Sequence, residues 1–430
     1  MKKLLIAATV VLVSSSPLVL LPMEKELTLT PKQVQKLTQN TTASLTQFKQ
    51  IPKNPRTITT ILTYKNKDLT EFKTSIQADT KLSISAIFWN AKGEPVFQLQ
   101  DGDYVAASQK SIVDDSIYNQ KPVDMTFWTK DGLTVYKEPY VLGTEKADSK
   151  LASFKPIKVS QAAQTHAGTY YLVDGEGWIN ASDLSTTDNR IEAVQKVLNE
   201  KYNNQEHISV YVKQLDTDRV AAINDEKSMY AASVAKLGVL YYAQERLSQK
   251  KLSLSDEYQY TSAVNGFPGA YDPDGSGKIS KMPDDKNYSL ENLLKAVAQN
   301  SDNVATNILG YYVTNQYDKA FQKSVDKAAA TSWNMDKKEL TARAAGTLME
   351  AVYRQNGDII TYLSSTDYDG ERISKNIDVP VAHKIGDAYD FKHDVAIVYA
   401  DSPFILSIFT DKEGYDKITS IADDVYGILK

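Results

Sequence analysis

The chain has 430 residues, a length that predicts two or three domains, and its hydrophobic fraction of 42% and charged fraction of 24% are those of ordinary globular proteins. A net charge of −5, without a basic tract or a zinc-like ligand cluster, argues against a nucleic-acid partner. The absence of cysteine excludes disulfides, thiolate catalysis and a lipid-modified amino-terminal cysteine. We expect no metal and no cofactor.

The amino terminus has the pattern of an export signal. Met1 is followed by two lysines, and residues 4–21 are apolar apart from three serines and Pro17. No Ala-x-Ala cleavage pattern occurs, and 18 residues are long enough to stay as a membrane anchor, so residues 1–22 are either a signal peptide or an anchor. The chain is therefore expected outside the cytoplasm. The polar residues 23–55 are interpreted as a linker.

From Thr57 to Leu184, short alternating runs such as Leu82–Trp89 predict β-strands separated by turns. A weak internal repeat divides this region into two small all-β modules of about 65 residues each, over 56–122 and 123–186. The repeat is visible where residues 99–108 match residues 172–182, and where Tyr64-Lys65 matches Tyr136-Lys137.

The end of the second module, Tyr170–Leu184, resembles the bacterial SH3-like GW modules of Gram-positive surface proteins. In that family such modules attach to wall polymers. The resemblance therefore implies a cell-wall polymer, peptidoglycan or teichoic acid, as the partner. The alternative is that the aromatic residues, Trp178 among them, fill two small barrel cores and the modules only space the rest of the chain. We expect Trp178 in a core rather than on a binding platform.

Residues 187–430 predict one large α/β domain. Apolar residues at helical spacing follow Ile191, and two strands over 208–215 and 219–223 form a hairpin. An apolar helix is expected near residues 230–240. Further helices are predicted at 290–298, from 304, at 317–329, 339–355 and 415–429, and strands at 379–386, 394–399 and 404–409. This order predicts a mostly antiparallel sheet with helices packed on it.

Within the turn-rich segment 250–288, Asp272–Gly277 looks like the start of a calcium loop. The twelfth position of that loop would be Pro283, where a calcium loop needs glutamate. We therefore expect no calcium there.

Ser233 and Lys236 are three residues apart, so a helix places both side chains on one face. Burial disfavours a charged lysine and lowers its pKa, which lets the amine accept a proton from the serine. Taken alone, a Ser-x-x-Lys tetrad is usually accidental. Two further motifs follow in order, Ser301-Asp302-Asn303 and Lys384-Ile385-Gly386.

Together the three motifs resemble the signature of class A β-lactamases and penicillin-binding proteins. This resemblance covers residues 188–430 and implies a β-lactamase/transpeptidase-like fold. It implies that Ser233 attacks a carbonyl and forms an acyl-enzyme, and that Lys236 receives the serine proton, although the identity of that base is disputed within the family. Ser301 would pass a proton to the leaving group.

The same resemblance implies the substrate-binding residues. Asn303 would hold a substrate amide while bonding the lysine, and Lys384, followed by Gly386, would supply positive charge for a substrate carboxylate. The backbone N–H groups of Ser233 and Asp387 would form the oxyanion hole. Asp302 is expected to fix the loop.

Two departures from the family pattern affect the expected chemistry. Ile385 stands where threonine or serine is usual, which puts recognition of a carboxylate in doubt. No Glu-x-x-Leu-Asn pattern occurs between Asn303 and Lys384, so a base that drives deacylation is lacking and efficient β-lactam hydrolysis is not expected. His383 and the pair His393-Asp394 are expected to have structural or substrate-contact roles rather than to form a triad.

Three functions remain open. The first is an exported, cell-wall-associated serine hydrolase that acts on a D-alanyl amide or ester of peptidoglycan or teichoic acid. The second is a class A-like β-lactamase. The third is a non-catalytic surface adhesin or scaffold with a relic hydrolase domain, against which the intact set Ser233, Lys236, Ser301, Asn303 and Lys384 argues. The sequence leaves the oligomeric state open.

Overall fold

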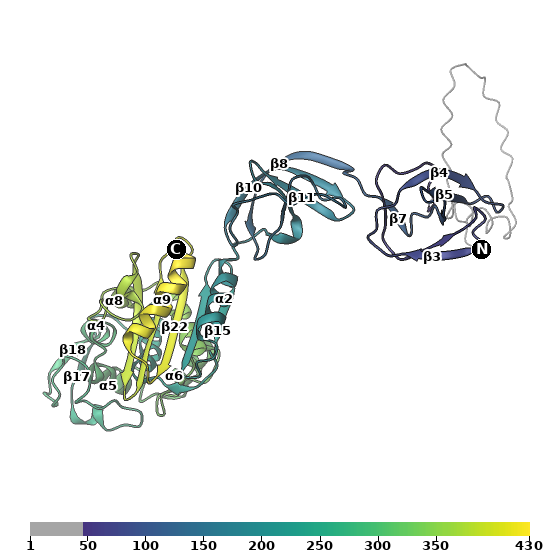
Figure 1. Cartoon of the computed structure of the whole chain (residues 1–430). Helices are drawn as coiled ribbons and strands as arrows, with labels where there is room; N and C mark the ends of the chain where they lie inside the picture. Colours follow the sequence, from purple (N-terminus) through teal and green to yellow (C-terminus); the bar gives the residue numbers. More distant parts are fainter. Residues whose placement is uncertain (1–45) are drawn as a thin grey trace, which may run out of the picture. The chain divides into compact units, whose positions relative to one another are not determined.

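A computed structural model describes residues 46–430 (Figure 1). The expected signal or anchor and most of the expected linker lie outside these residues. The described residues divide into two compact units, which meet between residues 116 and 117 of the chain and are described separately. Within the described residues, no helix is long and apolar enough to cross a membrane.

The first unit contains a small all-β module. Its main sheet has the strand order β3-β2-β6-β5-β4, and β1 pairs with β7. The strands are β1 Pro55–Thr57, β2 Ile61–Tyr64, β3 Phe72–Ile76, β4 Ile84–Trp89, β5 Pro95–Leu99, β6 Tyr104–Ala106 and β7 Ile112–Asp114. Phe97, Val105 and Ile112 form its core together with Phe48. Since Phe48 packs in this core, the module begins earlier than the expected boundary at residue 56.

The second unit begins with another all-β module. Its six-stranded sheet has the order β13-β8-β10-β11-β12-β9. The elements are β8 Asn119–Thr129, β9 Val135–Tyr136, β10 Pro156–Thr165, β11 Gly168–Val173, β12 Gly177–Asn180, the 3-10 turn η1 Ala181–Asp183 and β13 Leu184–Ser185. Strand β8 runs across the boundary that the sequence placed between residues 122 and 123, so the two modules separate a few residues earlier. Both modules are strand-rich with antiparallel sheets, as SH3-like modules are.

The sequence repeat corresponds to equivalent strand pairs in the two modules. Tyr64 lies opposite Tyr104 in the first module, and Tyr136 lies opposite Trp178 in the second. The hairpin turns that lead into β6 and β12 each contain an Asp-Gly pair, and the glycine of each pair has a positive φ. Trp178 is only 5% exposed and packs with Tyr170, which confirms the prediction that it belongs to a core.

The large domain is built on an antiparallel sheet of five strands in the order β15-β14-β22-β21-β20. These are β14 Ile208–Gln214, β15 Val220–Ile223, β20 Val381–Ala388, β21 Phe391–Val398 and β22 Phe404–Asp411. Helices α2 Arg190–Tyr202 and α9 Tyr415–Leu429 lie side by side on one face, where they bury an apolar cluster (Figure 1). The arrangement confirms the predicted α/β fold with a mostly antiparallel sheet.

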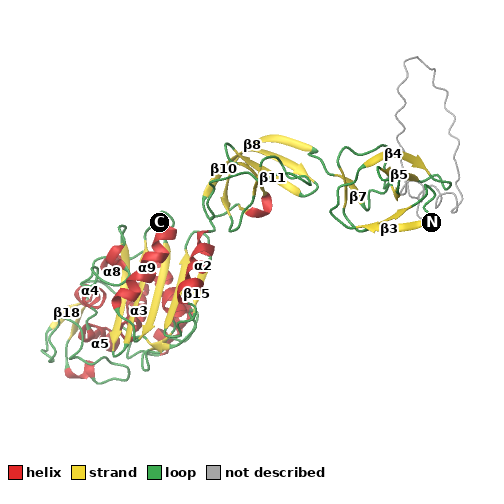
Figure 2. Ribbon diagram, in the orientation of Figure 1, coloured by secondary structure: helices red, strands yellow, loops and turns green. Residues whose placement is uncertain are grey.

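The other face of the sheet carries the helical insert and the larger apolar cluster (Figure 2). Its helices are α3 Leu237–Ser248, α4 Leu290–Asn300, α5 Asn303–Tyr312, α6 Lys319–Ala329, α7 Ala342–Gln355 and α8 Asp358–Leu363. Short elements complete the insert: β16 Met229–Tyr230, η2 Ala232–Lys236, β17 Glu257–Gln259, η3 Ser262–Asn265, β18 Asn287–Ser289, β19 Glu339–Leu340 and η4 Ser374–Asn376. Helix α8 and the pairing of β16 with β19 were not predicted from the sequence.

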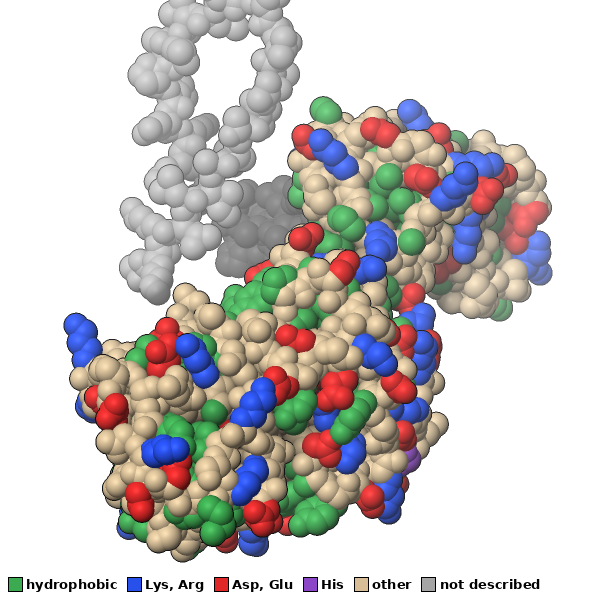
Figure 3. Space-filling view, turned by 90° about the vertical axis from the view of Figure 1, so that its left-hand side faces the viewer, with side chains coloured by type: hydrophobic (Ala, Val, Ile, Leu, Met, Phe, Trp, Pro, Cys, Tyr) green, Lys and Arg blue, Asp and Glu red, His purple; other side chains and the backbone are tan. Residues whose placement is uncertain are grey.

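Charged side chains of both signs lie on the surface of the molecule. On the face shown in Figure 3, basic and acidic side chains are interspersed. This mixture agrees with the small net charge of the chain.

Candidate active site

Ser233 lies on a strained turn that several neighbours hold in place. The preceding residue, Ala232, has φ of 49°, a left-handed conformation that an alanine adopts only when its surroundings enforce it. The N–H of Ala231 donates to the carbonyl of Lys338 at 2.7 Å. Ser233 is 8% exposed, and within the described residues its Oγ makes no hydrogen bond. The turn therefore presents an unengaged hydroxyl.

Lys236 is fully buried one turn further on. Its Nζ donates to the carbonyl of Ser301 and to Oδ1 of Asn303, both at 2.6 Å. Burial, followed by the neighbouring positive charge of Lys384, lowers the pKa of Lys236 well below its usual value. A neutral amine has two hydrogens and one lone pair. The two carbonyl acceptors engage the hydrogens and leave the lone pair to accept a proton.

Ser301 lies between two buried amines. It ends helix α4 in a left-handed conformation with φ of 54°. Its Oγ accepts a hydrogen bond of 2.7 Å from Nζ of Lys384 and lies 3.5 Å from Nζ of Lys236. Lys384 projects from the edge strand β20, and burial lowers its pKa to about 7 although Asp394 opposes the shift. The three motifs therefore meet at one hydroxyl group.

Asn303 contacts the lysine, but part of its amide is already occupied. Its Oδ1 accepts from Lys236, while its Nδ2 donates to the carbonyl of Asp272 at 2.7 Å. One hydrogen on Nδ2 remains for a substrate carbonyl. The sequence prediction of a bond to the lysine is thus matched by the geometry, and the bond to Asp272 was not foreseen.

The calcium-like segment Asp272–Gly277 supports the Ser-Asp-Asn loop. Asp302 caps α5 through Ala305, and its second carboxylate oxygen accepts the N–H groups of Lys278 and Ile279 at 2.6 and 2.9 Å. A Cβ on Gly277 would lie 2.3 Å from the Asp302 carboxyl group. Residues 46–430 contain no cluster of three or more His, Cys, Asp or Glu residues that would hold a metal ion.

Gly386 allows strand β20 to approach the nucleophile turn. A Cβ at this position would lie 2.6 Å from the carbonyl oxygen of Ala231, so only glycine fits without a shift of the backbone. Asp387 follows on the same edge strand, and its carboxylate is paired with Arg372 at 2.9 Å and Lys392 at 2.7 Å. Strand β20 therefore approaches the turn of Ser233 at Gly386, while the side chain of Asp387 is engaged in ion pairs.

His383 does not take part in a triad. Its Nδ1 lies 3.0 Å from Asp394, and its Nε2 lies 3.2 Å from Asp369 and 3.0 Å from Thr366. Burial by itself would lower the pKa of His383, but the two carboxylates raise it to about 9. This histidine joins strands β20 and β21 to the segment before η4. No hydrogen bond connects it with Ser233 or Lys236 in the described part of the chain.

His393 instead supports the turn that precedes the nucleophile. Its Nε2 donates to the carbonyl of Tyr230 at 2.9 Å, and its Nδ1 accepts from the N–H of Thr410 at 3.1 Å. Burial lowers the pKa of His393 to about 4, so the ring is neutral. It stacks on Phe409 with ring centroids 4.1 Å apart. Both histidines thus make the structural contacts that the sequence favoured over a triad.

Among residues 46–430, the side chain of Lys236 donates to Ser301 and Asn303, and no carboxylate is hydrogen-bonded to it or to Ser233. Glu339, the acidic residue nearest in sequence to the expected position of a deacylating base, is exposed on β19 and lies opposite Tyr230.

Two residues near the site were not identified from the sequence. They are Tyr271 and Lys338: Nζ of Lys236 and Nζ of Lys338 both lie over the ring of Tyr271. Both lie outside the three motifs, in turn-rich segments without a helical or strand pattern. The only sequence signal was the position of Tyr271 directly before the calcium-like segment.

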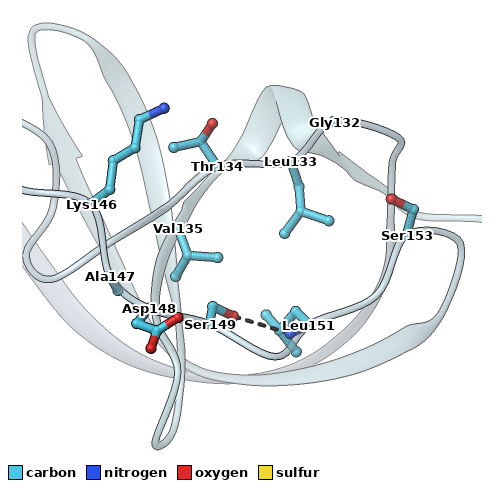
Figure 4. A pocket seen from close by; sticks show the side chains of 10 residues that line it. All are labelled: Gly132, Leu133, Thr134, Val135, Lys146, Ala147, Asp148, Ser149, Leu151 and Ser153. Carbon is cyan, nitrogen blue, oxygen red and sulfur yellow. Dashed lines mark hydrogen bonds between the residues drawn. The ribbon is translucent and has the colours of Figure 1, made fainter.

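A surface hollow of about 350 Å3 lies elsewhere, on the second β module (Figure 4). Leu133, Val135 and Leu151 line its apolar side, and Lys146 and Asp148 lie at its edge. It contains none of the residues of the three motifs, so this hollow is separate from the candidate active site.

Two families match parts of the sequence. Residues 189–429 match a family described as the Beta-lactamase enzyme family. Residues 47–113 match a family described as a domain of unknown function. No curated protein matches the sequence.

Several solved structures are similar to part of the chain. PBP-A is 15% identical, with 56% of this chain and 95% of that chain covered and a TM-score of 0.46. TLA-3 extended-spectrum β-lactamase is 18% identical, with 56% and 99% covered and a TM-score of 0.46. A β-lactamase from Sphaerobacter thermophilus is 15% identical, with 55% and 94% covered and a TM-score of 0.44.

Proposed function

This chain belongs to the β-lactamase enzyme family, and from that premise we propose that it is an exported, cell-wall-associated enzyme that acts on a D-alanyl amide or ester of peptidoglycan or teichoic acid. It is a serine hydrolase that works through an acyl-enzyme. The observation that carries the proposal is the pair of 2.6 Å hydrogen bonds from Lys236 to Ser301 and Asn303. These bonds engage both hydrogens of the buried neutral amine and leave its lone pair free to act as a base.

Acylation begins at Ser233. Its Oγ bonds to the substrate carbonyl carbon while its proton passes to Nζ of Lys236. The N–H groups of Ser233 and Asp387 stabilise the negative charge that develops on the carbonyl oxygen. Asp387 lies on β20, the edge strand of the sheet, so alternate N–H groups of this strand face away from β21.

Departure of the leaving group requires a proton. Ser301 supplies it, because its hydroxyl lies within 3.5 Å of Lys236 and accepts from Lys384. Lys384 can replace the proton on Ser301, since a pKa of about 7 makes this lysine a donor near neutral pH. The remaining hydrogen on Nδ2 of Asn303 binds a carbonyl of the substrate.

Deacylation is the step for which the fewest catalytic groups are available. No carboxylate is hydrogen-bonded to Ser233 or Lys236 in residues 46–430, so a hydrolytic water has no strong base beside it. The acyl-enzyme is therefore expected to live long with a β-lactam and to pass its acyl group to water or another acceptor slowly. This property favours a D-alanyl substrate over efficient β-lactam resistance.

A fluorescent penicillin tests the proposal. We expect slow covalent labelling at Ser233 that is absent in Ser233→Ala, with intact mass spectrometry locating the adduct. Rapid turnover of nitrocefin would instead support a β-lactamase. No labelling by any β-lactam or activated ester would support the non-catalytic scaffold.

The natural substrate and the wall association need separate tests. Mass spectrometry of muropeptides and of teichoic-acid D-alanine, before and after deletion of the gene, should show D-alanyl groups that accumulate without the enzyme. Sedimentation of the Ser233→Ala chain with purified cell walls tests attachment without turnover. A chain that stays in the supernatant would reduce the two β modules to spacers.

A further inference from the structure

Tyr271 is a buried residue that the steps above leave without a role. It is 8% exposed and lies in the segment between η3 and α4. Nζ of Lys236 lies over its ring at 4.5 Å from the centroid, and Nζ of Lys338 lies over the same ring, also at 4.5 Å. Two buried lysines thus share one aromatic ring.

The hydroxyl of Tyr271 reaches the turn that carries the nucleophile. It donates to the carbonyl of Ala232 at 3.2 Å, next to Ser233 in the chain. Ala232 is the residue in the strained left-handed conformation, so this bond helps to hold the strain. One side chain therefore contacts both the base and the turn of the nucleophile.

The backbone of Tyr271 is also held by hydrogen bonds. Its N–H donates to Oδ1 of Asn307 at 2.7 Å, and Nδ2 of Asn307 donates back to its carbonyl at 2.8 Å. Asn307 is fully buried in helix α5, which begins at Asn303. The paired bonds attach the backbone of Tyr271 to helix α5, whose first residue, Asn303, accepts a hydrogen bond from Lys236.

We propose that Tyr271 is a positioning residue whose ring face receives the ammonium group of Lys236 after this lysine takes the serine proton, and whose hydroxyl fixes the turn of Ser233. The inference rests on the proposed function, since that function makes Lys236 the base. During acylation the O–H bond of Ser233 breaks and an N–H bond forms on Lys236. The new ammonium has three hydrogens, of which Ser301 and Asn303 accept two.

The ring of Tyr271 supplies the remaining stabilisation. The negative face of an aromatic ring attracts an ammonium group, most strongly where water is excluded. Lys338 opposes this effect, because a second positive charge on the same ring disfavours protonation of Lys236. The other charged groups that act on Lys236 are Lys384, Lys281 and the carboxylate of Asp302. Substitutions at positions 271 and 338 should therefore change the same equilibrium in opposite directions.

The pH profile of acylation by a fluorescent penicillin tests this pair. In Tyr271→Leu, loss of the ring should move the acid limb of the profile to lower pH by roughly one unit and slow acylation at the plateau by roughly tenfold. Tyr271→Phe keeps the ring and should leave the limb in place. Lys338→Met should move the limb to higher pH.

Tyr202→Leu is the matched control. Tyr202 is also a buried tyrosine, but it packs in the cluster on the opposite face of the sheet. This variant should lose stability without a shift of the acid limb. An unmoved limb in Tyr271→Leu, or an equal shift in Tyr271→Phe, would overturn the proposal. If Tyr271→Leu does not fold, an unmoved limb in Lys338→Met overturns it.

A direct titration separates this inference from the proposed function. The 13Cε resonance of Lys236, assigned by its loss in Lys236→Met, reports the protonation of that amine in the Ser233→Ala protein without any reaction. We expect the midpoint to fall in Ser233→Ala/Tyr271→Leu and to rise in Ser233→Ala/Lys338→Met. Equal midpoints in all three proteins would reject the role of Tyr271 even if acylation occurs. Shifted midpoints with no acylation would reject the enzymatic proposal alone.

Discussion

Nζ of Lys384 donates a 2.7 Å hydrogen bond to Oγ of Ser301, and this contact connects two residues that are 83 positions apart. Because the same hydroxyl lies 3.5 Å from Nζ of Lys236, it is the common point of both buried amines. In the proposed proton route, Lys236 takes the proton of the nucleophile, and Lys384 replaces the proton that this hydroxyl gives to the leaving group.

Ser301→Gly should slow acylation by about 10²-fold, the usual contribution of a positioned proton donor. Glycine accepts the left-handed conformation of this residue, so the variant removes the hydroxyl without backbone strain. Ser301→Ala should be equally slow but also less stable by about 1 kcal/mol, because alanine disfavours this conformation. Stopped-flow acylation and thermal unfolding of both variants make the comparison. Acylation at the wild-type rate in either variant would exclude Ser301 from the proton route.

The buried lysine at position 384 should make the free energy of unfolding depend on pH. Burial lowers its pKa to about 7 in the folded state, against an ordinary value of 10.5 in the unfolded chain. Between these two values the unfolded chain binds the extra proton, so the contribution of Lys384 to the free energy of unfolding rises with pH. In Lys384→Met this rise should disappear between pH 7 and 9.5.

Urea unfolding across that pH range measures the effect as the difference in slope between Lys384→Met and the wild type. Lys375→Met is the control, because Lys375 forms an ion pair on the surface with Asp416. It should leave the slope as in the wild type. Identical slopes for Lys384→Met and the wild type would mean that Lys384 is charged in the folded protein at neutral pH.

His383 should have the opposite signature. Asp394 and Asp369 raise its pKa to about 9 in spite of burial, which is above the ordinary value of 6.5. The stability that this pairing contributes is therefore fully present below pH 6.5 and is lost as the pH rises through 9. His383→Gln should unfold at lower urea concentration than the wild type at pH 6, and the gap should narrow by pH 9.5. A gap that is constant with pH would show that the imidazole is neutral.

The sequence predicted the parts of the site that lie within motifs. Ser233, Ser301 and Lys384 each stand in a short pattern, and they lie on η2, at the end of α4 and on β20. The main sheet was predictable because its strands contain short apolar runs, such as Val395–Val398 in β21. Segments with such local patterns form the predicted strands because their apolar side chains pack in the core.

The contacts that fix the site were not predictable in the same way. Tyr271 reaches Lys236 across 35 positions, and Lys338 comes from a third segment, so no local spacing joins them. The pairing of Tyr230 with Glu339 is only two residues long on each side and has no alternating pattern. The boundary between the β modules was misplaced because β8 continues through a segment whose side chains are mostly exposed.

Gly386→Ala should damage the site while another glycine tolerates the same change. The new Cβ would lie 2.6 Å from the carbonyl oxygen of Ala231, which forces β20 away from the turn of Ser233 at a cost of about 2 kcal/mol. Since the oxyanion site needs both elements in contact, acylation should fall by at least about tenfold. Gly427→Ala adds the same methyl group to helix α9 with nothing within 4 Å, and should stabilise the fold by up to about 1 kcal/mol without changing acylation. Penicillin labelling rates and thermal midpoints of the two variants decide the matter, and equal acylation in both would disprove the close approach of β20 to the nucleophile.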